Sequence, residues 1–292
     1  MLWLLSVLGV VVILLGLVEV FHTLLHPSGR GRLSRLCVVA VWRSVRRLGD
    51  GPAAIAGPLS LVAVILFWAV LQAAGWALLL YPHIPGGYSY SPGIDPSQYG
   101  NVAEALYIST VTLTTLGYGD VIAIDPVIRF LSPFEALTGF ALLTAAVSWF
   151  MQIYPALGRR RALALRLSLL QEAGYANRID VAEASAVANT IEALTADLVQ
   201  IRVDLTQTSE TYYFWESNKS LSLPASLSYA CDLAASACRS GRPSVSTAGT
   251  MLNGSLDALA AFLKDEFHIH GSSTEDVFRS YAADHRYSYR EP

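Results

Sequence analysis

Six consecutive residues carry the pattern with the clearest chemical meaning in this chain, Thr115-Leu116-Gly117-Tyr118-Gly119-Asp120. Glycine reaches backbone angles closed to other residues, so alternating glycines let successive carbonyl oxygens point to one side. Rings of such carbonyls, together with the threonine hydroxyl, can replace the water shell of a potassium ion. The alternative for the last four residues is a surface turn, since Gly and Asp favour turns.

A short helix is predicted immediately before these six residues. Asn101 and Glu104 lie three positions apart ahead of an apolar run, the arrangement of a capping box. Residues 102–114 would form a helix of about 20 Å, too short to cross a bilayer. Such a helix suits a re-entrant segment that stops midway through the membrane, beside a water-filled cavity. Its carbonyl end carries a partial negative charge that would attract cations.

The composition indicates an integral membrane protein. Of the 292 residues, 53% are hydrophobic and only 15% are charged, whereas a soluble chain averages about 25% charged. A membrane-spanning helix requires about 20 mostly apolar residues. Three stretches meet this requirement, at residues 2–21, 53–81 and 130–153. The first lacks a basic start and a small-residue cleavage site, so we interpret it as a retained helix rather than a secretory signal.

Charges in the connecting segments predict the orientation. Residues 24–52 are rich in arginine, whereas residues 83–128 contain acidic side chains and no Lys or Arg. Positive loops remain in the cytoplasm. We therefore expect residues 24–52 and 156–292 to be cytoplasmic, residues 83–128 to face outside, and the protein to cross the plasma membrane (the inner membrane of the cell) several times.

Residues 33–49 within the basic connector mix apolar and arginine side chains. They are too short and too charged to span a bilayer. One interpretation is an amphipathic helix lying on the inner membrane surface. The other is an ordinary packed connector helix.

The six residues resemble the selectivity filter of the potassium channel family, which reads Thr-Val-Gly-Tyr-Gly and is usually followed by Asp. Leu116 replaces the usual valine, and the other positions match, at Thr115, Gly117, Tyr118, Gly119 and Asp120. We call residues 115–120 the filter segment. The resemblance covers residues 56–155 and implies that K⁺, as the permeant ion, binds backbone carbonyls of Thr115, Leu116, Gly117 and Tyr118. Since a filter needs four such loops and the chain has one, we expect a homotetramer.

The third span continues this resemblance. Gly139 follows Asp120 by 19 residues, where many family members place a hinge glycine in the inner helix. Close helix packing is the alternative for a glycine in a membrane helix. By resemblance, the inner helix lines the pore and closes near its cytoplasmic end, where Met151 and Tyr154 lie as gate candidates.

Glu135 lies beside the filter region and has more than one interpretation. Ser132-Pro133-Phe134-Glu135 reads as a helix start in which Glu135 closes a capping box. Asp125-Pro126 offers a rival start seven residues earlier. A carboxylate near the outer membrane boundary is also a functional candidate. We favour capping.

Three consecutive arginines, Arg159, Arg160 and Arg161, follow the third span. We expect them to anchor the helix end in anionic lipid headgroups, at about 1 kcal/mol per basic residue.

The cytoplasmic half contains a heptad row within residues 184–205. Its members recur at spacings of three and four, at Ala184, Val187, Ile191, Leu194, Leu198, Ile201 and Leu205. This spacing is typical of a coiled-coil seam between chains, but it would equally serve one helix of an intramolecular bundle. Four adjacent aromatic residues, 212–215, indicate a docking or packing cluster.

Several function classes are disfavoured. The chain has no Gly-x-Gly-x-x-Gly after a strand, no nucleophile–base pair and no metal-ligand set, so we expect neither an enzyme nor a bound cofactor. A net charge of −3 gives no reason to expect a nucleic-acid partner. The rival classes are a membrane receptor or scaffold that works through its helical tail, and an ion transporter subunit.

The predicted fold class is therefore an all-α integral membrane protein, with three membrane helices, a re-entrant pore helix and a helical cytoplasmic domain. The predicted parts are an N-terminal membrane helix, a basic connector, a pore domain and a cytoplasmic domain, at residues 1–23, 24–52, 53–155 and 156–292.

Overall fold

The computed structural model describes residues 2–24, 31–47 and 55–289, and nearly all of its regular structure is helical. The helices are α1 (Leu2–Leu24), α2 (Arg32–Arg46), α4 (Ala56–Leu80), α5 (Asn101–Leu113), α6 (Pro126–Glu172), α7 (Ala184–Gln207), α8 (Leu223–Cys238), α9 (Pro243–Phe267) and α10 (Thr274–Asp284). Three segments are long and apolar enough to cross a membrane, Trp3–Leu24, Ala56–His83 and Pro126–Glu172. The predicted all-α membrane fold is confirmed.

The chain divides into two compact units. The membrane unit comprises residues 1–44 and 58–151, and the bundle unit comprises residues 45–57 and 152–292. Helix α6 crosses this division without a break and continues through Pro155. The inner helix is therefore much longer than the predicted 130–153.

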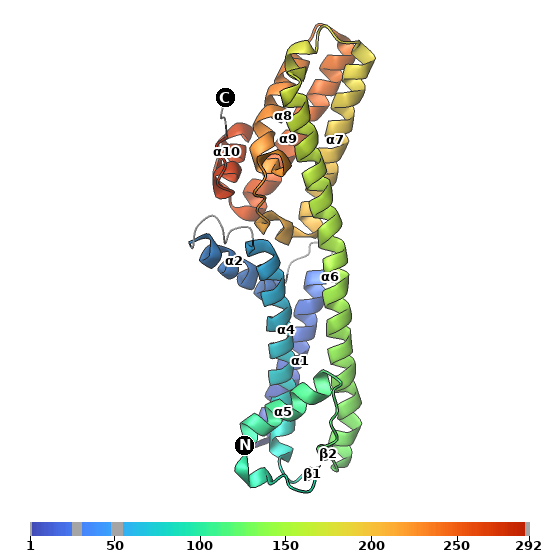
Figure 1. Cartoon of the computed structure of the whole chain (residues 1–292), viewed down its shortest axis with the longest axis vertical. Coiled ribbons are helices and arrows are strands. Elements are labelled where there is room, and N and C mark those ends of the chain that lie inside the picture. The colour runs from blue at the N-terminus through green and yellow to red at the C-terminus, as the bar shows by residue number, and fades with distance from the viewer. Residues whose placement is uncertain (1, 25–30, 48–54, 290–292) are drawn as a thin grey trace. The chain divides into compact units, whose positions relative to one another are not determined.

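In the membrane unit, α1 runs beside α4 (Figure 1). Glycine permits this close approach, because a Cβ at Gly9 would lie 2.6 Å from the carbonyl oxygen of Gly75. The buried Gln72 side chain crosses the same contact and donates from Nε2 to the carbonyl oxygen of Ile13, at 3.0 Å. A polar side chain inside an apolar helix pair is thus partly satisfied by backbone.

Helix α2 is joined to this helix pair by a buried polar group. The backbone N–H of Ser34 donates to Glu19 Oε1 at 2.8 Å, and Trp68 Nε1 donates to the Ser34 hydroxyl at 3.1 Å. Part of α2 is therefore packed as a connector, although Leu36 on another face remains exposed. Binding of that face to a membrane surface stays a prediction. Residues 25–30 and 48–54, at the ends of the connector and the start of the second predicted span, lie outside the described residues.

The bundle unit is built from α7, α8, α9 and α10 together with the end of α6 (Figure 1). Helix α7 packs against α9, and α9 packs against α8. All but the first member of the predicted heptad row are buried within this single chain, at Val187, Ile191, Leu194, Leu198, Ile201 and Leu205. The row therefore serves an intramolecular bundle, and its use as a seam between chains is corrected.

The four adjacent aromatic residues form part of the core of the bundle unit. Tyr212 stacks on Phe267, with ring centroids 4.0 Å apart, and on Tyr281 at 5.3 Å. The ring nitrogens of the buried His285 lie 3.1 Å from the Tyr281 carbonyl oxygen and 2.8 Å from that of Tyr212. The cluster is thus a packing feature that joins α9 and α10 to the loop after α7.

Candidate ion-conducting site

Helix α5 positions the filter segment as a short pore helix. It covers Asn101–Leu113, as predicted to within one residue. The predicted capping box is wrong, because Gly100 is the N-cap and makes no side-chain cap hydrogen bond. Glu104 is instead buried, and only its backbone N–H reaches back to the Gly100 carbonyl oxygen, at 3.1 Å. The predicted start of the helix is therefore one residue late, and the capping box is not the reason for it.

The backbone of the filter segment alternates. Every second residue has a left-handed φ, which is 57° at Thr115, 51° at Gly117 and 76° at Gly119. The two glycines adopt such angles at little cost, whereas a β-branched residue adopts them rarely. The sequence pattern explains the glycine positions, but the strained Thr115 could not be anticipated from it.

The filter segment is held at its N-terminal end by α5. The N–H of Leu116 donates to the carbonyl oxygen of Val111 at 3.0 Å, and that of Thr115 donates to Thr112 at 2.9 Å. Beyond these bonds, the side chains of Leu116 and Tyr118 are 53% and 69% exposed. A single chain therefore leaves much of the filter segment uncovered.

Two antiparallel strands, which we call the hairpin and which are connected through α5, hold the C-terminal end of the filter segment. Strand β2 (Val121–Ala123) begins directly after Asp120 and pairs antiparallel with β1 (Tyr88–Tyr90), so that Ser89 faces Ile122. Ser91 extends the contact, because its N–H donates to the Asp120 carbonyl oxygen at 2.8 Å. The sequence does not predict this hairpin, because its strands are three residues each and carry no distinct strand pattern.

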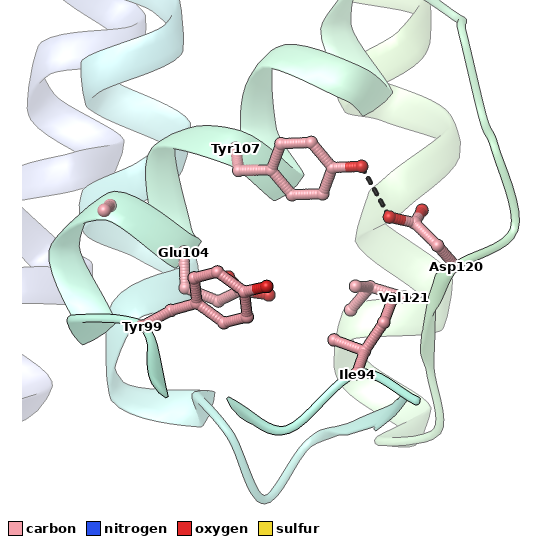
Figure 2. A pocket seen from close by; sticks show the side chains of 7 residues that line it. Ile94, Tyr99, Glu104, Tyr107, Asp120 and Val121 are labelled. Atoms are coloured by element: carbon pink, nitrogen blue, oxygen red, sulfur yellow. Dashed lines mark hydrogen bonds between the residues drawn. The ribbon is translucent and has the colours of Figure 1, made fainter. Parts of the chain in front are cut away.

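The Asp120 side chain also accepts a hydrogen bond from helix α5. The hydroxyl of Tyr107 on α5 donates to Asp120 Oδ2 at 2.5 Å (Figure 2). This bond joins α5 directly to the C-terminal end of the filter segment. The local sequence around Tyr107 does not predict this contact, because its partner lies 13 positions away.

A cavity of about 330 Å³ lies beside this bond (Figure 2). Its lining combines two carboxylates with two tyrosines and small apolar side chains, from Ile94, Tyr99, Ala103, Glu104, Tyr107, Asp120 and Val121. Among the residues that the structure describes, no basic side chain lines it. Two carboxylates without a counter-charge give this part of the membrane unit a negative potential, which attracts cations.

Glu135 does not cap a helix. Helix α6 begins earlier, where Asp125 Oδ1 accepts the N–H groups of Val127 and Ile128 at 2.8 and 3.2 Å. The rival start at Asp125-Pro126 is therefore correct, and the capping role of Glu135 is corrected. Glu135 is only 1% exposed, and its Oε1 has no hydrogen-bond partner among the residues that the structure describes.

A second cavity, of about 510 Å³, lies between the filter segment and α6. Gly117 and Gly119 line one side, and Arg129 and Glu135 line the other. This arrangement brings Glu135 near the filter segment, as the sequence suggested, but as a buried side chain of the inner helix.

Gly139 allows the inner helix to touch the pore helix. A Cβ at this position would lie 1.7 Å from the carbonyl oxygen of Leu113, the last residue of α5. Any larger residue would push the two helices apart, so close packing accounts for this glycine. Helix α6 continues unbroken through Gly139, and a hinge there stays a prediction. The gate candidates Met151 and Tyr154 are both exposed in the single chain.

The three arginines of α6 bind the bundle unit. Arg159 forms a bidentate pair with Asp204, at 2.7 and 2.8 Å, and Arg161 pairs with Glu216 at 2.6 Å. Arg160 is 3% exposed and donates to the backbone carbonyl oxygens of Thr211 and Phe214. A lipid headgroup cannot reach Arg160 in this structure, so the expected lipid contact is corrected for that residue.

Comparisons with known proteins agree with this geometry. Residues 63–154, about a third of the chain, match the model of a family described as ion channel. An uncharacterized membrane protein of Bacillus subtilis (strain 168), YdjJ, is 24% identical over 160 residues, which are 53% of this chain and 46% of the relative. The chain thus spans about half the length of that relative. No solved structure is significantly similar to the chain.

The family match includes most of α4, all of α5 and the filter segment, and α6 as far as Tyr154. It supports an ion channel family for this part of the chain and points away from an enzyme.

Proposed function

We propose that this protein is a potassium-selective channel, in which four copies of the chain surround one pore and K⁺ passes through passively. The observation that carries the proposal is the alternation of left-handed φ at Thr115, Gly117 and Gly119. The carbonyl oxygens of 115–118 are the proposed ion ligands, because rings of backbone carbonyls can substitute for the hydration shell of K⁺.

The exposure of the filter segment supports an assembly of several copies. Exposed apolar surface such as that of Leu116 and Tyr118 is where contacts with another molecule form. In one chain they are open, and neighbouring copies around an axis would cover them. One filter segment per chain makes four the number of copies that closes the ring.

The charge distribution supports the proposed orientation. Residues 83–128, which include the hairpin and the cavity beside Asp120, contain carboxylates and no Lys or Arg. We place this side outside the cell and the bundle unit in the cytoplasm, with the protein in the plasma membrane. Arg159 and Arg161 keep 46% and 39% of their side chains exposed, so anionic lipid remains a proposed partner for these two.

A pair of glycine variants tests the ion site. Gly119 and Gly86 both have open space where a Cβ would be added, but only Gly119 has a left-handed φ. Alanine in that conformation costs about 1–2 kcal/mol per chain, and the cost is incurred once per copy around the filter. We expect Gly119→Ala to lose potassium selectivity or conduction, whereas Gly86→Ala keeps both.

The measurement is K⁺ and Na⁺ flux in liposomes that contain the purified full chain, with native mass spectrometry to count the copies. Four copies per particle and K⁺ flux well above Na⁺ flux would support the proposal. An unchanged ion preference in Gly119→Ala would contradict the ion-site assignment. A parent protein that carries neither ion would favour the receptor or scaffold class.

A further inference from the structure

The cytoplasmic part of α6 has two faces with different partners. One face packs into the bundle unit of its own chain, through Ile153, Leu157, Arg160, Ala164 and Leu167. Hydrogen bonds from α8 secure this face, since the Tyr229 hydroxyl donates to the Leu170 carbonyl oxygen at 2.9 Å. The opposite face is exposed and carries a row that we call the α6 stripe, Pro155, Gly158, Ala162, Leu165 and Leu169.

The α6 stripe repeats with a regular period. Its members follow one another at spacings of three, four, three and four residues. A mean period of 3.5 residues is the one that keeps a helix seam facing a parallel partner. A strict row of this kind is narrower than the apolar face by which a helix packs into a globular core. The stripe is thus suited to a helix–helix seam.

Leu165 and Leu169 are the members that require a partner. They are 40% and 56% exposed, and they follow Arg159, Arg160 and Arg161, which mark the end of the membrane-spanning part by charge. At 1.5 Å per residue, Leu169 lies about 12 Å further along the helix than Arg161. Two leucines in line on one helix face, beyond the apolar membrane segment, indicate a covered surface.

We propose that the α6 stripe is a seam between copies of this chain, formed by the cytoplasmic extensions of the inner helices. The inference deepens the proposed function and rests on it, because a pore made from several copies brings the same helix of each copy together. Every copy has the same orientation in the membrane, so the stripes meet in parallel and at the same depth.

The sizes of the side chains fit such a seam. Gly158 and Ala162 allow helices to approach closely, and Leu165 and Leu169 fill the wider space further along. About two heptads are short for a free coiled coil. Tethering by a shared membrane assembly raises the effective concentration of neighbouring helices to about the millimolar range, which removes the need for a long seam.

Single-cysteine crosslinking tests the seam in the full chain. Cys37, Cys231 and Cys238 are first replaced by alanine, and Leu169→Cys is then compared with Val199→Cys. Val199 on α7 is a matched control because it is 50% exposed and lies off the stripe. With one cysteine per chain, every product of a short bismaleimide joins two copies. We expect at least about tenfold more dimer from Leu169→Cys, because both positions share the tethered concentration but only a seam position brings two cysteines within reach of the crosslinker.

Equal crosslinking of the two variants would overturn the proposal, and so would crosslinking by Val199→Cys alone. Either result would leave lipid or another protein as the occupant of the stripe. A second variant, Leu165→Asp with Leu169→Asp, should lower the temperature at which four-copy particles dissociate without reducing helical circular dichroism. A dissociation temperature equal to that of the parent would also overturn the seam.

Ion flux separates this proposal from the proposed function. Selective K⁺ flux without preferential crosslinking at Leu169 would remove the seam and keep the channel. Preferential crosslinking in a protein that carries no K⁺ would keep the seam and remove the channel.

Discussion

The filter segment and the heptad row of α7 are two repeating patterns in this chain. They differ in how far a single chain buries their side chains. Leu116 and Tyr118 of the filter segment remain largely exposed in one chain. Leu194 and Leu198 of the row are fully covered by helices of the same chain. A repeat therefore identifies which face of a segment will be buried, but not whether the atoms that bury it belong to the same chain.

The largest expected effect comes from breaking the heptad row. Leu194→Asp with Leu198→Asp would bury two unpaired carboxylates, at a cost on the order of several kcal/mol. We expect the bundle unit to unfold, seen as a loss of helical circular dichroism and a lower melting temperature. Val199→Asp, at an exposed position of the same helix, should change little. Dissociation of copies with full helix content would instead mean that the row joins chains.

Acidification should have a smaller effect. It should lower the folding stability of the bundle unit, whose core contains His285. Burial lowers the pKa of His285 from its ordinary value of 6.5 to about 4, because the charged ring loses its hydration. Between these values the unfolded chain binds the proton and the folded chain does not, so folding stability falls as pH decreases. The contribution of the neutral His285 ring to folding stability is therefore complete above about pH 6.5 and decreases below it.

The expected loss at pH 4 is at most about 3 kcal/mol, as the shift in pKa implies. Melting curves of the bundle unit within the full chain, recorded between pH 7 and pH 4, measure it. His285→Gln should flatten this dependence, whereas the exposed His270, changed to Gln, should leave it intact. An equally steep decline in His285→Gln would assign the effect to other groups.

The smallest expected effect concerns the filter segment, the other of the two patterns compared above. Tyr107→Phe removes the hydrogen bond to Asp120, at a cost of about 1.5 kcal/mol, the lower end for a bond to a charged group. We expect K⁺ flux to decline faster when external K⁺ is low, with assembly unchanged. Tyr99→Phe, in the same cavity, is the control, and an identical decline in both variants would exclude a specific role of the bond.

Local patterns in the sequence predicted the elements well. Apolar length predicted the three spans, and alternating glycines predicted the left-handed φ at Gly117 and Gly119. Contacts between distant segments were not predictable. Arg160 donates to carbonyl oxygens more than 50 positions away. The sequence predicts a lipid anchor at this arginine, whereas in the structure it forms a contact within the protein.

Glu135 illustrates the same limit. Its spacing from Ser132 satisfies a capping rule, but the rule depends on where the helix starts, and Asp125 starts it earlier. Two start signals of similar strength compete along the chain. In the folded protein Asp125 caps the start of α6, and the local pattern does not rank it above Ser132.

The pairing of β1 with β2 restricts how the length of this region can change in evolution. Seven residues, 114–120, connect the last residue of α5 to the first of β2. Inserting or deleting one of them would shift β2 by one position against β1 and exchange the half-buried Val121 and Ala123 for the exposed Ile122. Homologous chains that keep the hairpin should therefore also keep the number of residues between α5 and β2.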